Sequence, residues 1–289
     1  MLARDRFLSP NNATLVIVGG VDRTRAMRAL RQLLGGWRKS DELVPASFRS
    51  PTPADARILI ANHAESSEIE VRLATRGLAR GDRDYAAANL LASVVNQRWQ
   101  KLVPNAKLSV KHDAHALPGM LVMSARADTA RAAGVLESAR AVMKSVLQLP
   151  PSDEEFAAAK LEVSGSVDGM SADEKLATNL LNIEAYSLPN INDQMQAWNT
   201  LSPADVQRVA TRLLKDATVA SVVVGNVSDL KSGLASLNVE VLGDAKSNAV
   251  APQAATPKDD KTRRTHFVFP AQKNTHPVLK PQSTPPKPD

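Results

Sequence analysis

The stretch EVRLATRGLARGDRDYAAANLLASVVNQRW, residues 70–99, decides the fold class. Residues 70–75 alternate polar and apolar side chains, which is typical of a half-buried strand. Residues 77–84 form a polar segment with two glycines and two aspartates, as expected of a turn. From Tyr85 onward the apolar residues recur every three or four positions, at Ala88, Leu91, Val95, Trp99 and Leu102. The sequence therefore predicts a strand, a tight turn, and a long helix that is capped by Asp82 or Asp84 and packed on a sheet.

Upstream of this stretch, residues 14–19 (TLVIVG) form a short continuous apolar run, which predicts a buried strand. Asp22 is a plausible N-cap for a helix over residues 24–34, and Gly35 ends it. A phosphate-binding loop at Gly19 and Gly20 is excluded because too few glycines are present and no Gly-Lys-Ser/Thr follows.

Downstream, alternating and apolar segments predict further strands, and Ser-led segments predict helix starts. The expected strands are residues 57–61, 108–112, 120–125 and 219–224. The expected helices are residues 131–147 and three helices capped by Ser152, Ser171 and Ser202. The run 217–225 resembles 13–19, since both are apolar and end in glycine before a helix, so we expect the domain to begin and end on one sheet.

Composition narrows the function classes. The chain has 289 residues, 43% of them hydrophobic and only 3% aromatic, so the core is aliphatic. It contains no cysteine, which excludes disulfides, thiolate catalysis and cysteine-ligated zinc. Residues 243–289 carry +4 of the formal net charge of +6, so the basic balance reflects this segment and does not indicate nucleic-acid binding.

The chain divides into two parts by composition. Residues 1–242 predict one α+β domain, and residues 243–289 hold eight of the 18 prolines with few apolar residues, which predicts a disordered tail. Within that tail, residues 266–269 (HFVF) are the one apolar contact candidate. No apolar run reaches the length of a membrane span, and the first residues do not resemble a signal peptide, which leaves the cytoplasm or the periplasm open.

Two motifs resemble the zinc peptidase family of pitrilysin, insulinase and mitochondrial processing peptidase. Residues 76–91 read R-G-x-x-R-G-D-x-D-Y followed by A-x-N-L-L, and residues 12–22 read N-A-T-L-V-x-V-G-x-V-D. The resemblance covers residues 10–235 and points to the later, non-catalytic domain of the family. It implies an antiparallel-rich mixed sheet packed on helices, in a sandwich of the processing-peptidase type.

The catalytic signature of that family, H-x-x-E-H, is absent from this sequence. None of the five histidines (His63, His112, His115, His266 and His276) is followed by Glu-His at the required spacing. His112 and His115 are a weak metal candidate, because residues i and i+3 of a strand point to opposite faces. The resemblance therefore implies that zinc is held by a partner half and that this chain has no cofactor and no catalytic residue of its own.

The resemblance implies one further site residue. The later domain of the family supplies an Arg and a Tyr that help to hold the substrate, and Arg98 matches the Arg. Leu108 stands where the Tyr is expected and the glycine turn is missing. Arg98 is thus a weak substrate-binding candidate.

The sequence is compatible with three functions. The preferred hypothesis is a non-catalytic half or subunit of a zinc metallopeptidase, which forms one side of a peptide-binding chamber and pairs with an H-x-x-E-H-bearing half. The alternative is a stand-alone protein-binding or peptide-binding scaffold on the same fold. The third is an independent metal hydrolase that uses His112, His115 and an acidic residue.

Overall fold

The computed structural model describes residues 9–39, 55–165, 171–234, 237 and 239–244. All of them belong to the first of the two compact units of the chain, Met1–Lys246. The helical elements are η1 (Pro10–Asn12), α2 (Arg23–Leu34), α3 (Tyr85–Leu102), η2 (Thr129–Arg131), α4 (Ala132–Gln148), α5 (Asp153–Gly165), α6 (Ala172–Tyr186), α7 (Ile191–Thr200), α8 (Pro203–Leu214) and α9 (Val227–Gly233). The strands are β1 (Ile58–Asn62), β2 (Glu68–Arg76), β3 (Lys107–Asp113), β4 (Met120–Asp128), β5 (Ala220–Gly225) and β6 (Val239–Asp244).

The strands form one six-stranded mixed sheet in the order β3-β4-β2-β5-β1-β6. The pairs β3–β4, β4–β2 and β2–β5 are antiparallel, whereas β5–β1 and β1–β6 are parallel. The predicted antiparallel-rich mixed sheet is thereby confirmed. Strand β5 comes from the far end of the domain and lies in the interior of the sheet, between two strands of its beginning.

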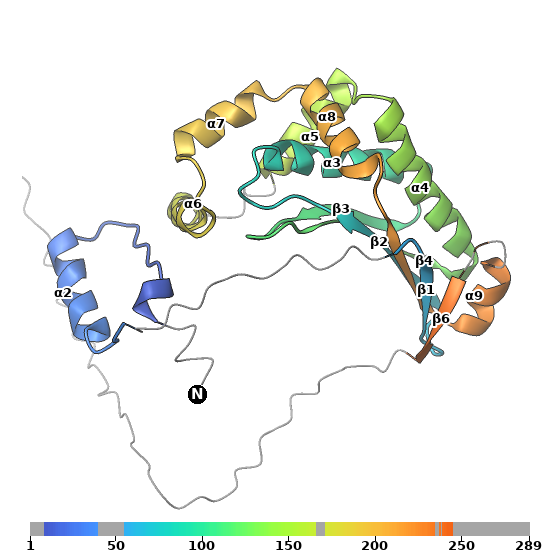
Figure 1. Cartoon of the computed structure of the whole chain (residues 1–289), viewed down its shortest axis with the longest axis horizontal. Helices are drawn as coiled ribbons and strands as arrows, with labels where there is room; N and C mark the ends of the chain where they lie inside the picture. The colour runs from blue at the N-terminus through green and yellow to red at the C-terminus, as the bar shows by residue number, and fades with distance from the viewer. Residues whose placement is uncertain (1–8, 40–54, 166–170, 235–236, 238, 245–289) are drawn as a thin grey trace, which may run out of the picture. The chain divides into compact units, whose positions relative to one another are not determined.

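Helices cover one face of this sheet. Side chains of β2 alternate along the strand, with Ile69, Val71 and Leu73 buried under the helices and the intervening residues more exposed. Helices α3, α4 and α8 pack on the buried face (Figure 1). The alternation read in the sequence at residues 70–75 therefore reports a sheet with one covered and one open face.

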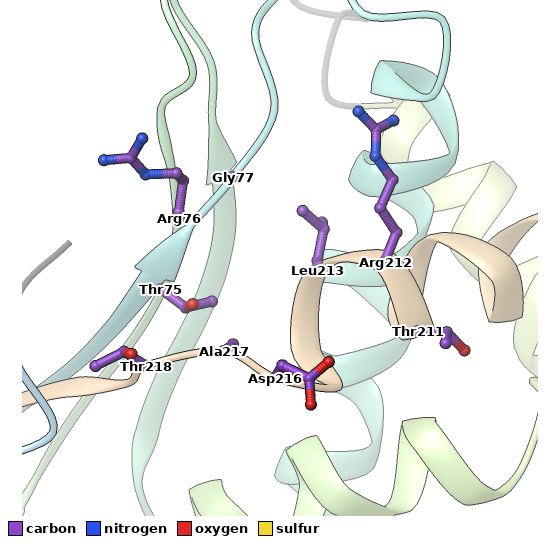
Figure 2. Close-up of a pocket in the computed structure, with 9 residues that line it drawn as sticks. All are labelled: Thr75, Arg76, Gly77, Thr211, Arg212, Leu213, Asp216, Ala217 and Thr218. Atoms are coloured by element: carbon purple, nitrogen blue, oxygen red, sulfur yellow. The ribbon is translucent and has the colours of Figure 1, made fainter. Parts of the chain in front are cut away.

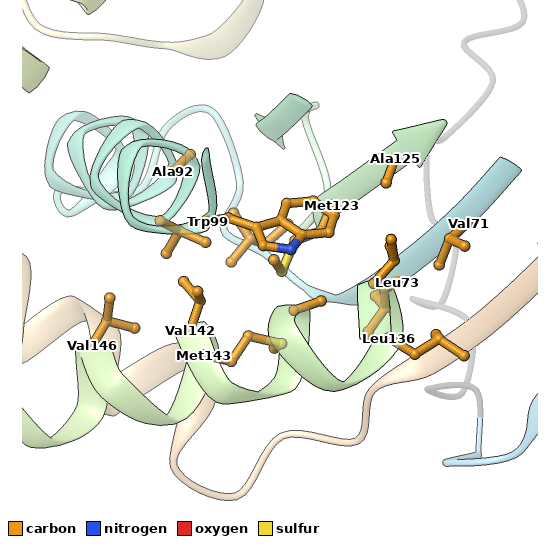
Figure 3. Close-up of a cluster of buried hydrophobic side chains, with 14 of the residues drawn as sticks. Val71, Leu73, Ala92, Trp99, Met123, Ala125, Leu136, Val142, Met143 and Val146 are labelled. Carbon is orange, nitrogen blue, oxygen red and sulfur yellow. The ribbon is translucent and has the colours of Figure 1, made fainter. Parts of the chain in front are cut away.

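The core lies between α3, α4 and the sheet, and Trp99 is its largest side chain. Trp99 is fully buried and donates a hydrogen bond from Nε1 to Ser138 Oγ of α4, at 2.9 Å. Around it lie aliphatic side chains of α4 and of the covered face of β2 and β4 (Figure 3). Four members of the predicted α3 stripe are buried as expected, but Leu102 is 56% exposed because α3 ends there.

One predicted strand is wrong. Residues 14–19 are not a strand, and Leu15 and Ile17 are 60% and 49% exposed. The sheet begins with β1 instead, and the helix that follows the segment, α2, has the predicted Asp22 cap but no buried residue. An apolar run specifies a strand that is suited to a sheet interior, yet it does not specify which sheet.

Other differences concern elements that the sequence did not reveal. Helix α7 has no buried residue, and β6 is a short edge strand, so neither carries a strong apolar pattern. The proposed tail from residue 243 and its 266–269 contact lie outside the described residues, apart from the end of β6. None of the helices in the described ranges is both long and apolar enough to cross a membrane.

Candidate functional site

The turn between β2 and α3 is held in place by two arginines of α8. Arg208 contacts both carboxylate oxygens of Asp84, at 2.9 Å each, and Arg212 donates to Asp84 Oδ2 at 2.6 Å. Arg212 also binds both oxygens of Asp82, at 2.9 and 2.8 Å. Asp84 is 3% exposed, so its charge is buried and compensated by two guanidinium groups.

The predicted side-chain cap of α3 does not form. Asp82 Oδ1 instead accepts from the backbone N–H of Asp84 at 2.9 Å, within the turn before the helix. Asp84 occupies the N-cap position of α3 but its side chain makes no capping bond. Its carboxylate turns toward α8 instead, and the hydrogen bond from Arg208 lowers its pKa. The pKa of Asp82 is lowered by Arg212 in the same way. Both carboxylates are therefore ionised and engaged, which disfavours either as a general acid or base.

His112 is the second buried polar group near this turn. It lies on the covered face of β3 and accepts a hydrogen bond at Nε2 from the backbone N–H of Leu78, at 2.9 Å. A methyl group at Gly77 would come within 2.9 Å of the ring, so only glycine fits there. Burial lowers the pKa of His112, so its ring is neutral. The ring packs against Tyr85 in a tilted arrangement, with 5.6 Å between the ring centroids and 49° between the ring planes.

The structure does not bring His112 and His115 together as a metal site. The Nε2 lone pair of His112 is already occupied by Leu78, whereas His115 is exposed and lies 3.3 Å from Asp113. Within the described ranges, no group of three or more His, Asp or Glu side chains is placed to hold a metal ion. His266 and His276 lie outside the described residues.

Arg98, the substrate-binding candidate, joins α3 to the start of α5. Its guanidinium binds Glu155, with Nη2 to Oε2 at 2.8 Å, and donates to the backbone oxygens of Leu149 and Pro150, at 3.1 Å each. Glu155 also completes the Ser152 capping box of α5. The bond from Arg98 lowers the pKa of Glu155. With these bonds in place, Arg98 is positioned to hold two helices together, and its role toward a substrate stays a prediction.

A pocket of about 340 Å³ opens where β2 ends and where α8 leads into β5 (Figure 2). Its polar lining includes Thr75, Arg212 and Asp216. The guanidinium of Arg212 is held by Asp82 and Asp84, so it offers no free charge to a ligand. The pocket has no nucleophile paired with a base, and it provides a polar recess rather than a reaction centre.

The open face of the sheet is a further candidate functional surface. The register aligns side chains across strands: Lys107 of β3 lies beside Arg126 of β4, which lies beside Glu70 of β2. Arg72 and Arg126 both pair with Glu70, at 2.5 and 3.3 Å. This half of the face is therefore polar and carries both signs of charge.

The same rows continue into an apolar half. Glu70 aligns with Val224 of β5, and Val224 with Ala61 of β1, while Arg72 aligns with Val222 and then Leu59. All four apolar residues are partly exposed. An extended chain that lies across this face would meet charged and hydrogen-bonding groups on one side and aliphatic groups on the other.

Sequence reasoning missed Arg208 and Arg212. Their only signal is their spacing of four residues on the expected last long helix, which places both on one side of it. Nothing in the sequence links that side to Asp82 and Asp84, more than a hundred residues earlier.

Comparison with known proteins places this arrangement in a family. Residues 3–163 match the model of the peptidase M16 inactive domain. No curated protein matches the chain. Among solved structures, the peptidase M16 inactive domain from Pseudomonas fluorescens is 21% identical with a TM-score of 0.64, over 73% of this chain and 53% of that one.

Two proteases have the same fold. A protease from Helicobacter pylori is 15% identical with a TM-score of 0.67, over 76% of this chain and 57% of that one. The periplasmic protease PqqL from Escherichia coli is 16% identical with a TM-score of 0.58, over 72% of this chain and 25% of that one. The chain thus spans little more than half the length of the first two structures. By its sequence match and its sheet, this chain belongs to the M16 peptidase family and carries the inactive domain of that family.

Proposed function

We propose that this chain is the non-catalytic half of a zinc metallopeptidase of the pitrilysin and insulinase type. It forms one wall of a peptide-binding chamber, and a partner half with an H-x-x-E-H motif holds the zinc ion. The observation that carries the proposal is the one-sided sheet of an inactive-domain fold, with helices on one face and a broad open face on the other.

The open face suits an extended peptide. Its rows of Lys, Arg and Glu side chains, together with Ser109 and Ser124, offer hydrogen bonds. The adjoining Val222, Val224 and Leu59 offer apolar contact. In this proposal the other half supplies the metal ion, since the sequence of this chain contains no H-x-x-E-H. A chamber wall needs no reacting group, only surface that holds the substrate near the zinc.

The proposal is tested by capture from the cells that produce the protein. The affinity-tagged full chain is expected to retain a protein that contains H-x-x-E-H, identified by mass spectrometry, with about one zinc ion per complex. Mixing the two purified proteins is expected to produce peptide cleavage that neither shows alone.

The control is the same partner with the Glu of H-x-x-E-H changed to Gln, which is expected to bind this chain without cleaving. A stable monomer that retains no such protein, yet binds peptides, would support the scaffold alternative. Stoichiometric zinc on the isolated chain together with cleavage by it would overturn both readings.

A further inference from the structure

Residues 14–34 have a sequence pattern that occurs a second time in the chain, where the structure shows it as a strand followed by a helix. Residues 14–19 (TLVIVG) and β5 (ASVVVG) are both apolar runs that end in glycine. Each is followed by a helix with a side-chain cap, Asp22 for α2 and Asn226 for α9. In the second copy of the pattern, the strand is an interior strand of the sheet, held between β1 and β2.

The strand-like parts correspond position by position when the two glycines are aligned. Leu15 and Ile17 then stand at the positions of Ser221 and Val223, which face the core of the sheet and are 1% and 0% exposed. In the segment 14–34 the equivalent side chains are 60% and 49% exposed. Leu15 and Ile17 are therefore residue types that are typical of a sheet interior, but their side chains are exposed.

The helical parts correspond as well. Counting four and eight residues from each cap leads to Leu230 and Leu234 after Asn226, which are 1% and 0% exposed. The same count from Asp22 leads to Ala26 and Leu30, on the apolar side of α2. That side also carries Met27, Leu33 and Leu34, which are 42%, 79% and 43% exposed.

Within residues 14–34, the turn and the start of the helix are stabilised by local interactions. Gly19 has φ of 132°, which only glycine adopts without strain, and the N–H of Val21 bonds to its carbonyl at 2.8 Å. The Asp22 carboxylate accepts from the N–H of Arg25 at 2.9 Å and starts α2. The turn and the helix are formed, and what the unit lacks is a sheet and a helix layer to pack on.

The sheet of this chain cannot supply that place, because its interior position between β1 and β2 is filled by β5. In a second molecule of this chain the same position is filled by that molecule's own β5. The unit therefore fits a different sheet of the same architecture, in which this position is open. The polar side of α2 carries Arg25, Arg28 and Arg31, so the rim of that site is expected to be acidic.

The exposed apolar side chains are numerous enough for a stable contact. Leu15, Ile17, Val21, Met27, Leu33 and Leu34 are each between 42% and 79% exposed. At about 100 Å² each they supply roughly 600 Å² of apolar surface, close to the ~800 Å² per partner of a standard interface. Backbone pairing along 14–19 would add to this.

We infer that residues 14–34 complete the sheet of the catalytic half, as a strand inserted between two of its strands and a helix laid beside it. This inference rests on the proposed function, since it names the surface through which the two halves are held together.

The test compares two double variants of the tagged full chain in capture of the H-x-x-E-H protein. Leu15→Asp with Ile17→Asp is expected to weaken retention at least about tenfold, because two carboxylates would enter an apolar site. The matched control is Leu149→Asp with Leu161→Asp, which changes two leucines that are 62% and 75% exposed elsewhere. The control is expected to retain the partner as the wild type does.

A second measurement does not depend on loss of binding. The chain has no cysteine, so Ile17→Cys creates a single attachment point for a thiol-directed cross-linker. Cross-links are expected to reach two neighbouring strands of the partner sheet. Cross-links to the outer helices of the partner only would overturn the inference.

The failures of the two proposals are distinguishable. Equal retention of the partner by both double variants would overturn the inference and leave the proposed pairing intact. If the wild-type chain retains no H-x-x-E-H protein, the pairing and the inference fall together.

Discussion

The carboxylate of Asp84 is the individual group on which the turn before α3 depends most. It is 3% exposed and receives hydrogen bonds from two arginines that are themselves about half exposed. Removal of one partner of a buried ion pair costs more than the pair contributes, because the remaining charges lose their compensation. The sequence places Asp84 at a helix start, and the tertiary contact with α8 assigns it this different task.

Asp84→Ala is expected to lower the free energy of unfolding by about 2–3 kcal/mol, measured by urea denaturation. Asp82→Ala, whose side chain is 20% exposed, is the control and is expected to cost about 1 kcal/mol or less. Because the pKa of Asp84 is lowered in the fold, its contribution is present above pH ~4 and is lost as the pH falls below that value. An equal cost for both variants would contradict this account.

His112→Gln is expected to reduce the loss of stability on mild acidification. Burial lowers the pKa of His112 in the fold, so the unfolded chain binds the proton first. The contribution of the neutral ring is complete above about pH 6.5 and is lost as the pH falls toward the lower pKa of the fold. The free energy of unfolding is measured by urea denaturation at about pH 7.5 and 5.5. The difference between the two values is expected to be smaller in the variant than in the wild type, by up to about 1 kcal/mol. An unchanged difference would show that His112 does not titrate in this range.

Among the elements, α3 and α5 are joined through one guanidinium. Arg98 reaches from the last turns of α3 to Glu155 and to two carbonyls that precede α5. The side chain of Arg98 is 13% exposed, so its guanidinium bonds mainly to protein atoms rather than to water. This arrangement accounts for an arginine at the end of α3 without any substrate.

Arg98→Ala is expected to cost about 2 kcal/mol in the free energy of unfolding, since Glu155 and two carbonyls lose their donor. Lys101→Ala is the control, because Lys101 is 72% exposed and stands 4.0 Å from Glu155. If the chain pairs with a catalytic half as proposed, a raised KM of that complex without loss of stability would instead assign Arg98 to the substrate.

Helix α2 is expected to contribute surface rather than stability. Met27→Gln combined with Leu33→Gln should change the free energy of unfolding of the isolated chain by less than about 0.5 kcal/mol, because both side chains are exposed. Leu91→Gln is the comparison, because Leu91 is 1% exposed. Burial of the glutamine amide at this position is expected to cost more than about 3 kcal/mol in the free energy of unfolding. A large cost of the α2 variant would show that α2 packs on the domain in solution.

At the scale of the whole sheet, an interior position is filled by β5, a strand from late in the chain. β5 pairs with β1 and β2, which precede it by about 150 residues of chain, so the interior of the sheet depends on contacts that are distant in sequence. Val223, which is fully buried, lies directly beside Ile60 and Val71 in the register. The sheet and the helix layer are thus expected to unfold as one unit.

Val223→Ala is expected to lower the free energy of unfolding by about 1–3 kcal/mol while leaving a single transition. Far-UV circular dichroism reports the helices. Because the chain has three tryptophans, Trp37→Phe and Trp198→Phe are introduced as a common background, in which the fluorescence of Trp99 reports the core. The two unfolding curves should coincide with and without Val223→Ala. Separate transitions would mean that the β5–β1 side unfolds independently.

Local pattern was sufficient for most of the fold. The alternation at residues 70–75, the stripe from Ala88 to Trp99 and the serine caps before α5, α6 and α8 are each confirmed, because a strand, a helix and a cap depend on residues close in sequence. The absence of H-x-x-E-H and the resemblance to an inactive peptidase domain were also visible in the sequence.

The remaining features depended on contacts between distant residues. Only the folded chain shows that Asp84 binds Arg208 and Arg212, that Arg98 is held by Glu155, and that β5 occupies the interior position for which residues 14–19 are equally suited. Side-chain chemistry and periodicity specify what a segment can form and which face it buries. The partner that meets that face is selected by packing across the whole sheet, which no local window of sequence contains.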